Sequence, residues 1–290
     1  MLETDIRQLA RSENRLHTSV RPVEYTRMFE MEETYWWFVA RRRLVCELID
    51  QLAMPAKSRL LDVGCGTGAN LKAFGKQFER VGIDMSSAAL SFCQQRGIDS
   101  LVQAKVEDSG LEHDTFDVVT ALDMLEHVDD DMLALRELWR VAKPGGFLLI
   151  TVPAFGFLWS EHDEALHHRR RYTVAELESK LASAGFGEVR ISYFLATLFF
   201  PILIARIVQN LTKRRIEPQA THVILPVWLN SLIVTVLDWE RRLLQWTWRL
   251  PFGVSIVALA QKPSAPSKIP TDTKHPGDQE VTAESLVHSS

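Results

Sequence analysis

Cysteine and long apolar runs are both scarce in this sequence, and each scarcity limits what the protein can be. Three cysteines, Cys46, Cys65 and Cys93, occur in 290 residues, and none forms a CxxC pair or another metal-ligand spacing. A disulfide framework is therefore not expected, which indicates a reducing compartment. No run reaches the roughly 18 apolar residues of a membrane-spanning helix, and the N-terminus lacks the apolar core of a secretion signal. These absences predict a cytoplasmic protein, with peripheral contact at the inner face of the membrane left open.

An excess of positive charge is also lacking. The chain carries 33 Lys and Arg against 37 Asp and Glu, a formal net charge of −4, which argues against nucleic acid as a partner. Charged residues at 24% and apolar residues at 46% are ordinary for a globular protein. A chain of this length can bury a full core as one domain with additions.

What the sequence does contain is an alternation of short apolar strands with amphipathic helices. Strands are expected over 60–63, 80–84, 100–103, 116–122, 147–152, 189–193 and 254–260, and helices over 32–53, 70–78, 86–95, 130–141 and 174–184. This order predicts an α/β fold, a Rossmann-like, doubly wound, seven-stranded and mostly parallel sheet with a terminal antiparallel strand. The expected units are an N-terminal helical segment or lid (1–54), a main domain (55–193 with 251–262), an apolar helical insert between the last two strands (194–250) and a disordered tail (263–290).

The stretch 59–71 organises the rest of the chain. Its strand runs into a loop with Gly64, Gly66 and Gly68, which allow sharp turns and a close approach of the backbone to a ligand. Asp62 stands at the carboxyl end of the strand, where open α/β sheets bind ligands. Two cofactors are compatible with these glycines, S-adenosylmethionine (SAM) and NAD(P), because the loop also fits the dinucleotide fingerprint, with Asp84 as its ribose-binding acid.

Four segments in sequence order resemble the motifs of class I SAM-dependent methyltransferases. They are Leu60-Leu-Asp62-Val-Gly64-Cys-Gly66-Thr-Gly68, Val81-Gly-Ile-Asp84-Met85, the segment from Phe116 through Glu126-His127, and Leu138 through Pro144-Gly-Gly146. The resemblance covers about 33–195 and the last strand. It favours SAM, as does the lack of any Tyr followed four residues later by Lys, the commonest proton donor of short-chain dehydrogenases. An NAD(P)-dependent oxidoreductase remains one alternative, and a membrane-associated scaffold with a degenerate SAM fold is the other.

The resemblance implies a role for each cofactor-side residue. Asp62 would face the ammonium group of SAM, and Asp84 would accept hydrogen bonds from both ribose hydroxyls. The acid that usually meets adenine falls at Lys105, so this chain departs from the pattern, with Glu107 the nearest acid. The cofactor-binding residues expected are Asp62, Gly64, Cys65, Gly66, Gly68, Asp84, Met85, Val106 and Leu122.

The acceptor side is expected beyond the fourth and fifth strands. His127 is the candidate base, since its unperturbed pKa suits proton transfer near neutral pH, and His162 is a second candidate. The alternative is that Glu126-His127 is bonded to backbone at a helix start, and that the three arginines after His168 pair with Glu176 or Glu178 to anchor their loop. Substrate contacts are expected at Trp37, Arg41, His167, Arg170 and Tyr172. No metal is expected, because His162, Asp163 and His167 match no recognised ligand motif.

The acceptor class follows from one absence and one unusual region. No Pro-Pro dipeptide exists, so the signature of amino-group methylation on adenine or glutamine is missing. Two uncharged runs, 191–205 and 223–237, have Trp and Arg at their margins, which suits an interfacial membrane anchor, a cap on the chain's own domain, or a homodimer contact. Similar methyltransferases with a Trp-Trp-Phe N-terminal helix and such an insert are often bacterial and tied to surface-glycan biosynthesis. We therefore expect O-methylation of a glycan, lipid-linked sugar or other small molecule near the membrane surface.

Overall fold

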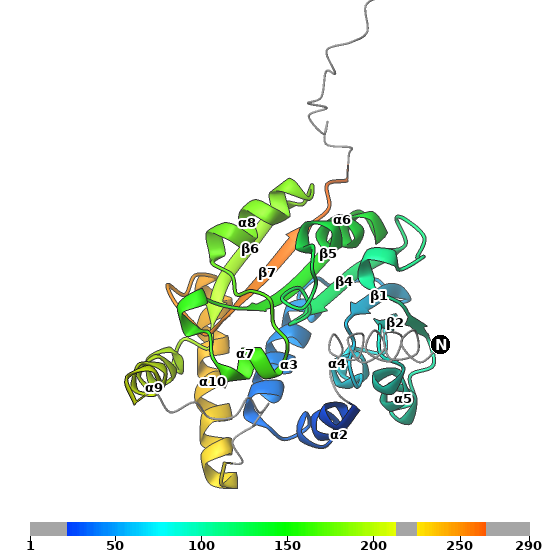
Figure 1. The fold of residues 1–290 in the computed structure, drawn as a ribbon. Coiled ribbons are helices and arrows are strands. Elements are labelled where there is room, and N and C mark those ends of the chain that lie inside the picture. Colours follow the sequence, from blue (N-terminus) through cyan, green and yellow to red (C-terminus); the bar gives the residue numbers. More distant parts are fainter. Residues whose placement is uncertain (1–21, 213–224, 265–290) are drawn as a thin grey trace, which may run out of the picture.

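A seven-stranded sheet forms the centre of the protein in the computed structural model, which describes residues 22–212 and 225–264 (Figure 1). The spatial order of the strands is β3-β2-β1-β4-β5-β7-β6. All strands run parallel except β7, which lies antiparallel between β5 and β6. The bounds are β1 (Ser58–Val63), β2 (Phe78–Asp84), β3 (Leu101–Gln103), β4 (Phe116–Leu122), β5 (Ala142–Pro153), β6 (Gly187–Phe194) and β7 (Ser255–Gln261). The expected fold class is confirmed.

Helices cover both faces of this sheet, which explains why its strands are nearly continuous apolar runs. Successive side chains of a strand point to opposite faces, so Leu60 and Leu61 of β1 belong to two different clusters of buried residues. One cluster includes α6 (Asp131–Val141) and α8 (Val174–Ser183). The other includes α3 (Trp36–Asp50), α4 (Ala69–Ala73), α5 (Ser87–Gln95) and α10 (Val227–Thr247), on the opposite side of the sheet in Figure 1.

Local capping chemistry sets several of the helix starts. The Ser86 hydroxyl accepts a hydrogen bond from the Ala89 N–H, and the Thr173 hydroxyl accepts one from the Glu176 N–H, as expected for N-cap residues. Asp130 caps α6 in the same way, through the N–H of Leu133. These short-range signals are legible in the sequence because donor and acceptor lie three residues apart.

Three expected elements differ from the structure. The helix expected over 32–53 is shorter: residues 32–35 form a turn and only α3 (36–50) is helical, while a further helix, α2 (Pro22–Met31), precedes the turn. The helix over 70–78 ends at Ala73, because the backbone of Phe74 is extended and its buried ring anchors the turn into β2. The fifth strand begins at Ala142, since the Pro-Gly-Gly segment continues into the strand.

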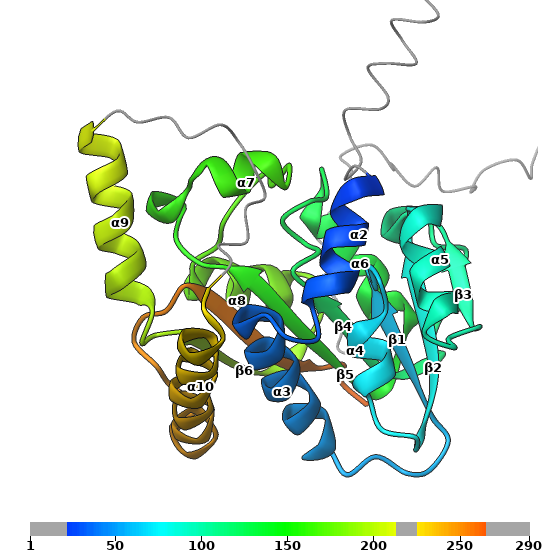
Figure 2. The ribbon, with the colours of Figure 1, turned by 90° about the horizontal axis from the view of Figure 1, so that it is seen from below.

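The insert consists of two helices with different surroundings. Helix α10 packs beside α3, as both views show (Figures 1 and 2), whereas α9 (Phe199–Thr212) stands apart from the sheet at one end. The buried carboxylate of Glu240 on α10 accepts hydrogen bonds from the backbone N–H groups of Ala196 and Thr197, each at 2.9 Å. Part of the insert is thus integral to the domain. The start of the second uncharged run and Lys213–Arg215 lie outside the described residues, as do 1–21 and all but the first residues of the expected tail.

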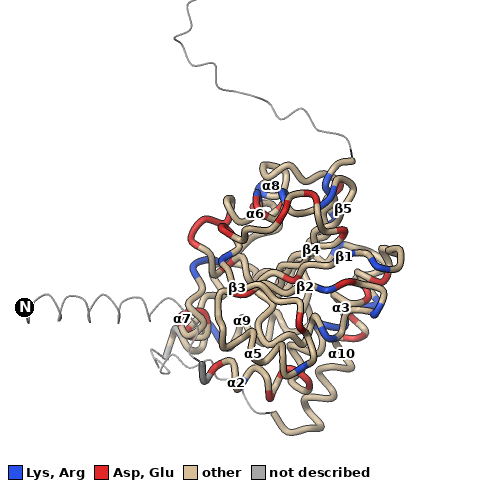
Figure 3. Tube along the Cα trace, turned by 90° about the vertical axis from the view of Figure 1, so that its right-hand side faces the viewer, with Lys and Arg blue, Asp and Glu red and all other residues tan. Residues whose placement is uncertain are grey.

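Two further observations bear on the surface. None of the helices in the described ranges is long and apolar enough to cross a membrane. Figure 3 shows Lys and Arg interspersed with Asp and Glu along the chain trace.

The strand order reverses between β1 and β4, because the chain moves outward to β2 and β3 and then returns to the other side of β1. In open α/β sheets ligands bind in the crevice beyond the carboxyl ends of the strands at such a reversal. Asp62, Asp84 and Leu122 all lie at the carboxyl ends of their strands. These three residues therefore lie at the edge of the sheet where ligands bind in folds of this kind, and their contact with a ligand stays a prediction.

Candidate active site

The glycine loop after β1 is closely packed on both sides. A Cβ atom on Gly64 would lie 2.6 Å from Cγ of Met124, and one on Gly68 would lie 2.9 Å from Sγ of Cys93. Both glycines also have a positive φ, and Gly68 occupies the N-cap of α4. The loop is therefore restricted to glycine at these two positions by contact and by conformation. The N–H groups of Gly64 and Cys65 donate to the Ile83 carbonyl, which fixes the loop against the end of β2.

Asp84 links the glycine loop to the start of α5 through hydrogen bonds. One carboxylate oxygen accepts the N–H of Gly66 at 3.0 Å, and the other accepts the N–H of Ser86 at 2.9 Å. Burial raises the pKa of Asp84, and the two backbone N–H groups oppose that rise. Each carboxylate oxygen has a second lone pair, so the group can still accept hydrogen bonds from two neighbouring hydroxyls.

Asp62 is a buried acid with one oxygen left over. Its Oδ1 accepts a hydrogen bond from the Thr120 hydroxyl at 2.6 Å, while Oδ2 has no partner among the described residues. Burial raises the pKa of Asp62 to about 7, against the hydrogen bond from Thr120 and the charge of Arg41. Because an unpaired buried carboxylate oxygen is unfavourable, a cationic ligand group at this point would be stabilised. The ammonium group of SAM fits this requirement.

Helix α2 and the turn that follows it contact the glycine loop and α5, and they lie within the N-terminal segment (1–54) for which a helical segment or lid was expected. Glu32 accepts a short hydrogen bond from the Thr67 hydroxyl of the loop and pairs with Arg96 at the end of α5. Phe29 stacks on Phe92 with ring centroids 4.8 Å apart. Figure 2 shows α2 beside α5, above the loop.

Tyr25 on the same helix lies close enough to Asp84 to feel its charge. It is buried, and its pKa is raised to about 12 by burial and by the charge of Asp84. Helix α2 thus contacts three cofactor-side elements: the loop, α5 and the end of β2. Helix α2 lies within the N-terminal segment (1–54) for which a lid was expected, and its action as a lid stays a prediction.

The remaining cofactor-side residues lie around the same crevice. Cys65 and Leu122 are buried, and Met85 is half exposed just beyond Asp84. Val106 is buried at the start of the 3₁₀-helix η1 (Val106–Asp108), with Lys105 immediately before it. The structure brings these residues to one edge of the sheet, and their contact with a cofactor stays a prediction.

On the acceptor side, Arg41 and Asp123 form a buried ion pair. Asp123 follows β4 with a positive φ, and its carboxylate pairs with the Arg41 guanidinium and accepts the Thr151 hydroxyl at 3.0 Å. The guanidinium also lies over the ring of Trp37, 4.4 Å from its centroid. Arg41 was expected near the substrate mouth, and it lies between Asp62 and the loop after β4, acting on the pKa of Asp62 and of Glu126.

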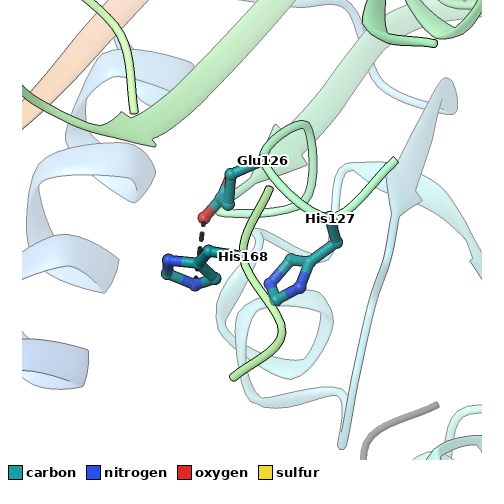
Figure 4. A group of neighbouring side chains, drawn as sticks. All are labelled: Glu126, His127 and His168. Carbon is teal, nitrogen blue, oxygen red and sulfur yellow. Dashed lines mark ion pairs between the residues drawn. The ribbon is translucent and has the colours of Figure 1, made fainter. Parts of the chain in front are cut away.

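Glu126, His127 and His168 converge just beyond that pair (Figure 4). Glu126 is fully buried and neither carboxylate oxygen has a hydrogen-bond partner among the described residues. Its Oε1 faces Nε2 of His168 at 3.9 Å, and the His127 ring meets the His168 ring edge to face. Burial and the charge of Asp123 raise the pKa of Glu126, whereas burial and His168 lower that of His127 to about 3, so His127 is neutral.

Asp163 holds His168 in place. It lies on α7 (Glu161–Ala165), is fully buried, and accepts Nδ1 of His168 at 2.9 Å. The same carboxylate binds the Arg171 guanidinium through two contacts of 2.8 and 3.0 Å. Burial alone would raise its pKa, but the hydrogen bonds from His168 and Arg171 lower the pKa well below the usual range. Asp163 is therefore an ionised anchor. The sequence analysis named it only as part of a rejected ligand set.

The other predicted acceptor-side residues have varied surroundings. Arg170 pairs with Asp131, and Arg169 pairs with Asp129, so the partners expected at Glu176 and Glu178 were wrong. Tyr172 is fully buried and donates to Asp131 at 2.9 Å. His167 is exposed and His162 lies half-buried on α7. The assignment of Arg170, Tyr172, His162 and His167 to the substrate or to catalysis stays a prediction.

Comparison with known proteins identifies the domain that carries these groups. Residues 61–150 match the family described as "Methyltransferase domain". Residues 61–150 form a SAM-dependent methyltransferase domain. The match decides the cofactor for SAM over NAD(P), and the unpaired Asp62 oxygen and crowded glycine loop fit it.

Curated relatives cover only part of the chain. The ubiquinone biosynthesis O-methyltransferase of Pseudomonas putida is 40% identical over 105 residues, 34% of this chain and 45% of the relative. The protein of that name from Hahella chejuensis is 37% identical over 112 residues, 36% of this chain and 47% of the relative. The chain thus spans about half the length of the curated relatives that it matches.

Solved structures show the same fold at low sequence identity. A chain of the complex between the Haloferax volcanii Trm112 methyltransferase activator and its methyltransferase partner aligns with TM-score 0.55 and 19% identity, over 86% of this chain and 100% of that one. A SAM-dependent methyltransferase from Thermotoga maritima aligns with TM-score 0.50 and 17% identity, over 82% and 95%. These likenesses concern the fold.

Proposed function

We propose that the protein is a SAM-dependent O-methyltransferase whose acceptor is a hydroxyl group of a glycan, a lipid-linked sugar or another small molecule near a membrane surface. One observation carries this proposal. The buried Glu126 carboxylate, with both oxygens unpaired, lies beside two imidazoles at the carboxyl end of β4, next to the end of β1 where the cofactor loop begins. Such a cluster can orient a hydroxyl and receive its proton.

The cofactor, when bound, supplies an electrophilic methyl group. The chain's own residues then have three tasks. Asp62 and the glycine loop hold the methionine end, and Asp84 holds the ribose. The cluster of Glu126, His127 and His168 positions the acceptor oxygen in line with the methyl group, which is the main requirement for a displacement reaction. Helix α2 excludes water from the cofactor.

The relatives support O-methylation, because the matched proteins are named O-methyltransferases. The surface supports an apolar acceptor. On α9 the exposed residues Phe200, Ile204, Ile207 and Leu211 recur at helical spacing, so they form one apolar stripe. Trp239 and Trp246 on α10 are also largely exposed. A stripe of this kind suits a lipid-water interface.

The test of O-methylation is turnover. Purified protein with SAM is incubated with hydroxyl-bearing acceptors of three kinds, free glycans, lipid-linked sugars and aromatic alcohols, and products are analysed by mass spectrometry for the gain of one methyl group. We expect S-adenosylhomocysteine to form in step with an O-methylated product. SAM binding without turnover on any of these, or a product methylated on nitrogen, would contradict the proposal; the first result would favour the scaffold alternative.

The membrane contact has its own test. We expect sedimentation with anionic phospholipid vesicles to be lost in the double variant Ile204→Ser/Leu211→Ser. The control is Leu133→Ser, which alters an exposed apolar residue of α6, outside the α9 stripe. Equal sedimentation of wild type and both variants would show that the α9 stripe is not a membrane contact.

A further inference from the structure

We propose that Glu126, His127 and His168 bind one divalent transition-metal ion, such as Zn²⁺, Mn²⁺ or Fe²⁺. One nitrogen from each histidine and one oxygen from the glutamate lie within 4.8 Å of one another. Two imidazoles and one carboxylate are a donor set that these ions prefer, whereas Mg²⁺ and Ca²⁺ prefer oxygen donors.

The Glu126 carboxylate is the observation that most needs an explanation. It is fully buried, both oxygens lack a partner among the described residues, and it points toward His168 (Figure 4). The separation of 3.9 Å between Oε1 and Nε2 is too long for a hydrogen bond. Ligand atoms on a shared ion, each about 2.1 Å from it, lie about 3.4 Å apart in tetrahedral geometry, so the three side chains need to close by about 1 Å.

The surroundings of the two imidazoles are those of oriented metal ligands. The hydrogen bond from Nδ1 of His168 to Asp163 leaves Nε2, with its lone pair, facing Glu126. Arg171 and the Ser160 backbone in turn fix Asp163. The His127 ring is hydrogen-bonded to the backbone of Leu166. Ligand histidines commonly donate their second ring N–H to a carboxylate or a backbone carbonyl in this way.

A role for the ion rests on the proposed function. Three protein ligands leave at least one position open, as in catalytic rather than structural sites. With all three side chains bound to the ion, the cluster orients the acceptor hydroxyl through the metal and does not itself take the proton. The positive charge lowers the pKa of a hydroxyl bound at the open position, so its proton passes to water. That oxygen forms the new O–C bond to the methyl group, and the C–S bond breaks with its electron pair remaining on sulfur, which becomes a neutral thioether.

The experiment measures the metal without cofactor or acceptor. Full-length protein is stripped with chelator and titrated with Zn²⁺ by calorimetry, and with Co²⁺ by visible absorption, whose intensity reports the coordination geometry. We expect one ion per chain. Glu126→Gln and His168→Gln, which keep side-chain size closely, should each weaken binding at least about 100-fold, and Asp163→Asn by about 10- to 100-fold.

The control and the contrary outcomes are equally defined. His113→Gln alters an exposed histidine elsewhere and should leave Zn²⁺ affinity unchanged. Thermal melting with and without Zn²⁺ shows whether each variant is folded, and only wild type and control should gain stability from the ion. No bound ion, or equal affinity in folded Glu126→Gln, would overturn the metal site. SAM binding is measured in parallel: wild-type protein that binds SAM but no Zn²⁺ would refute the metal site and leave the proposed function standing.

Discussion

The two halves of the strand-end crevice differ in how their polar atoms are engaged. In the cofactor half, both oxygens of Asp84 already hold backbone N–H groups of the elements that they connect. In the acceptor half, both oxygens of Glu126 and the Nε of Arg41 are buried without partners among the described residues. The first half is organised by hydrogen bonds to the backbone, and Oδ2 of Asp62 is its unpaired buried oxygen among the described residues. The second is organised by a ring of ion pairs around unpaired groups, an arrangement that favours a ligand there.

Arg41 interacts electrostatically with acids of both halves. Its guanidinium pairs with Asp123 on the acceptor side and lowers the pKa of both Asp62 and Glu126 against the effect of burial. The methionine end of the cofactor and the acceptor cluster therefore share one cation. A substitution in one half can therefore alter ligand binding in the other half through Arg41. The largest loss of SAM affinity is expected when the contacts of Asp84 with the backbone are removed.

Replacing Asp84 should have the largest effect. In Asp84→Ala we expect SAM affinity to fall at least about 100-fold. The variant loses the two hydrogen bonds expected from the ribose hydroxyls to the Asp84 carboxylate, and hydrogen bonds to a charged group contribute about 1.5–3 kcal/mol each. Calorimetric titration with SAM measures this loss. The Zn²⁺ affinity of the acceptor cluster should be unchanged, since Asp84 lies on β2, on the far side of β1 from β4.

The matched control is Asp99→Ala, an exposed acid near the start of β3. It should bind SAM as the wild type does. Undiminished SAM affinity in Asp84→Ala, with the melting temperature retained, would remove the ribose role from this residue.

The same contrast explains what the sequence could and could not predict. The cofactor half could be predicted from the sequence because strand, glycine loop and acid follow one another within a few residues. Asp62 and Asp84 lie at the carboxyl ends of their strands, and Gly64 follows β1, as the motif predicts. The acceptor half combines Arg41 of α3, Glu126 of the loop after β4, and His168 and Asp163 of the segment after β5. No spacing in the sequence predicts that these side chains lie close together. The only signals were the Glu126-His127 dipeptide and the cluster of histidines and arginines around His168.

The position of helix α2 within the expected N-terminal segment (1–54) could not be predicted, for a related reason. Helix α2 is held by specific contacts with distant residues, such as those of Glu32 in the turn after it with Thr67 and Arg96. The partners of the arginines were misplaced because loop conformation, not helix periodicity, brings Asp129 and Asp131 to them. Long-range pairing of charges depends on the folded path of the chain.

A second prediction concerns the charge of Asp62. Since burial raises its pKa in the folded protein to about 7, above the unfolded value, the protonated form is stabilised by folding. Its contribution to stability is complete below about pH 4 and is lost as pH rises to about 7, with an upper bound of about 4 kcal/mol. We expect Asp62→Asn to flatten this pH dependence in chemical denaturation and to weaken SAM binding about 10-fold at pH 8.

The pH dependence of binding sharpens the test. A cationic ligand group favours ionised Asp62, so wild-type affinity for SAM should rise between pH 6 and pH 8, as the carboxyl group ionises. In Asp62→Asn that rise should be absent. A parallel rise in both proteins would mean that Asp62 does not face the ammonium group.

The smallest effect is expected at the contact between α2 and the glycine loop. Glu32 is buried between Thr67 and Arg96, whereas Glu33 pairs with the same Arg96 from a half-exposed position. Loss of the Glu32 charge should favour opening of the helix, and we expect Glu32→Gln to speed SAM dissociation about threefold to tenfold, since each tenfold corresponds to about 1.4 kcal/mol. Glu33→Gln should change the rate less than about twofold, because exposed ion pairs contribute little. Stopped-flow measurement of SAM release distinguishes the two. Equal rates in Glu32→Gln and Glu33→Gln would show that α2 packs on the loop without controlling exit of the cofactor, and the difference between the two halves would then lie in the strand-end acids alone.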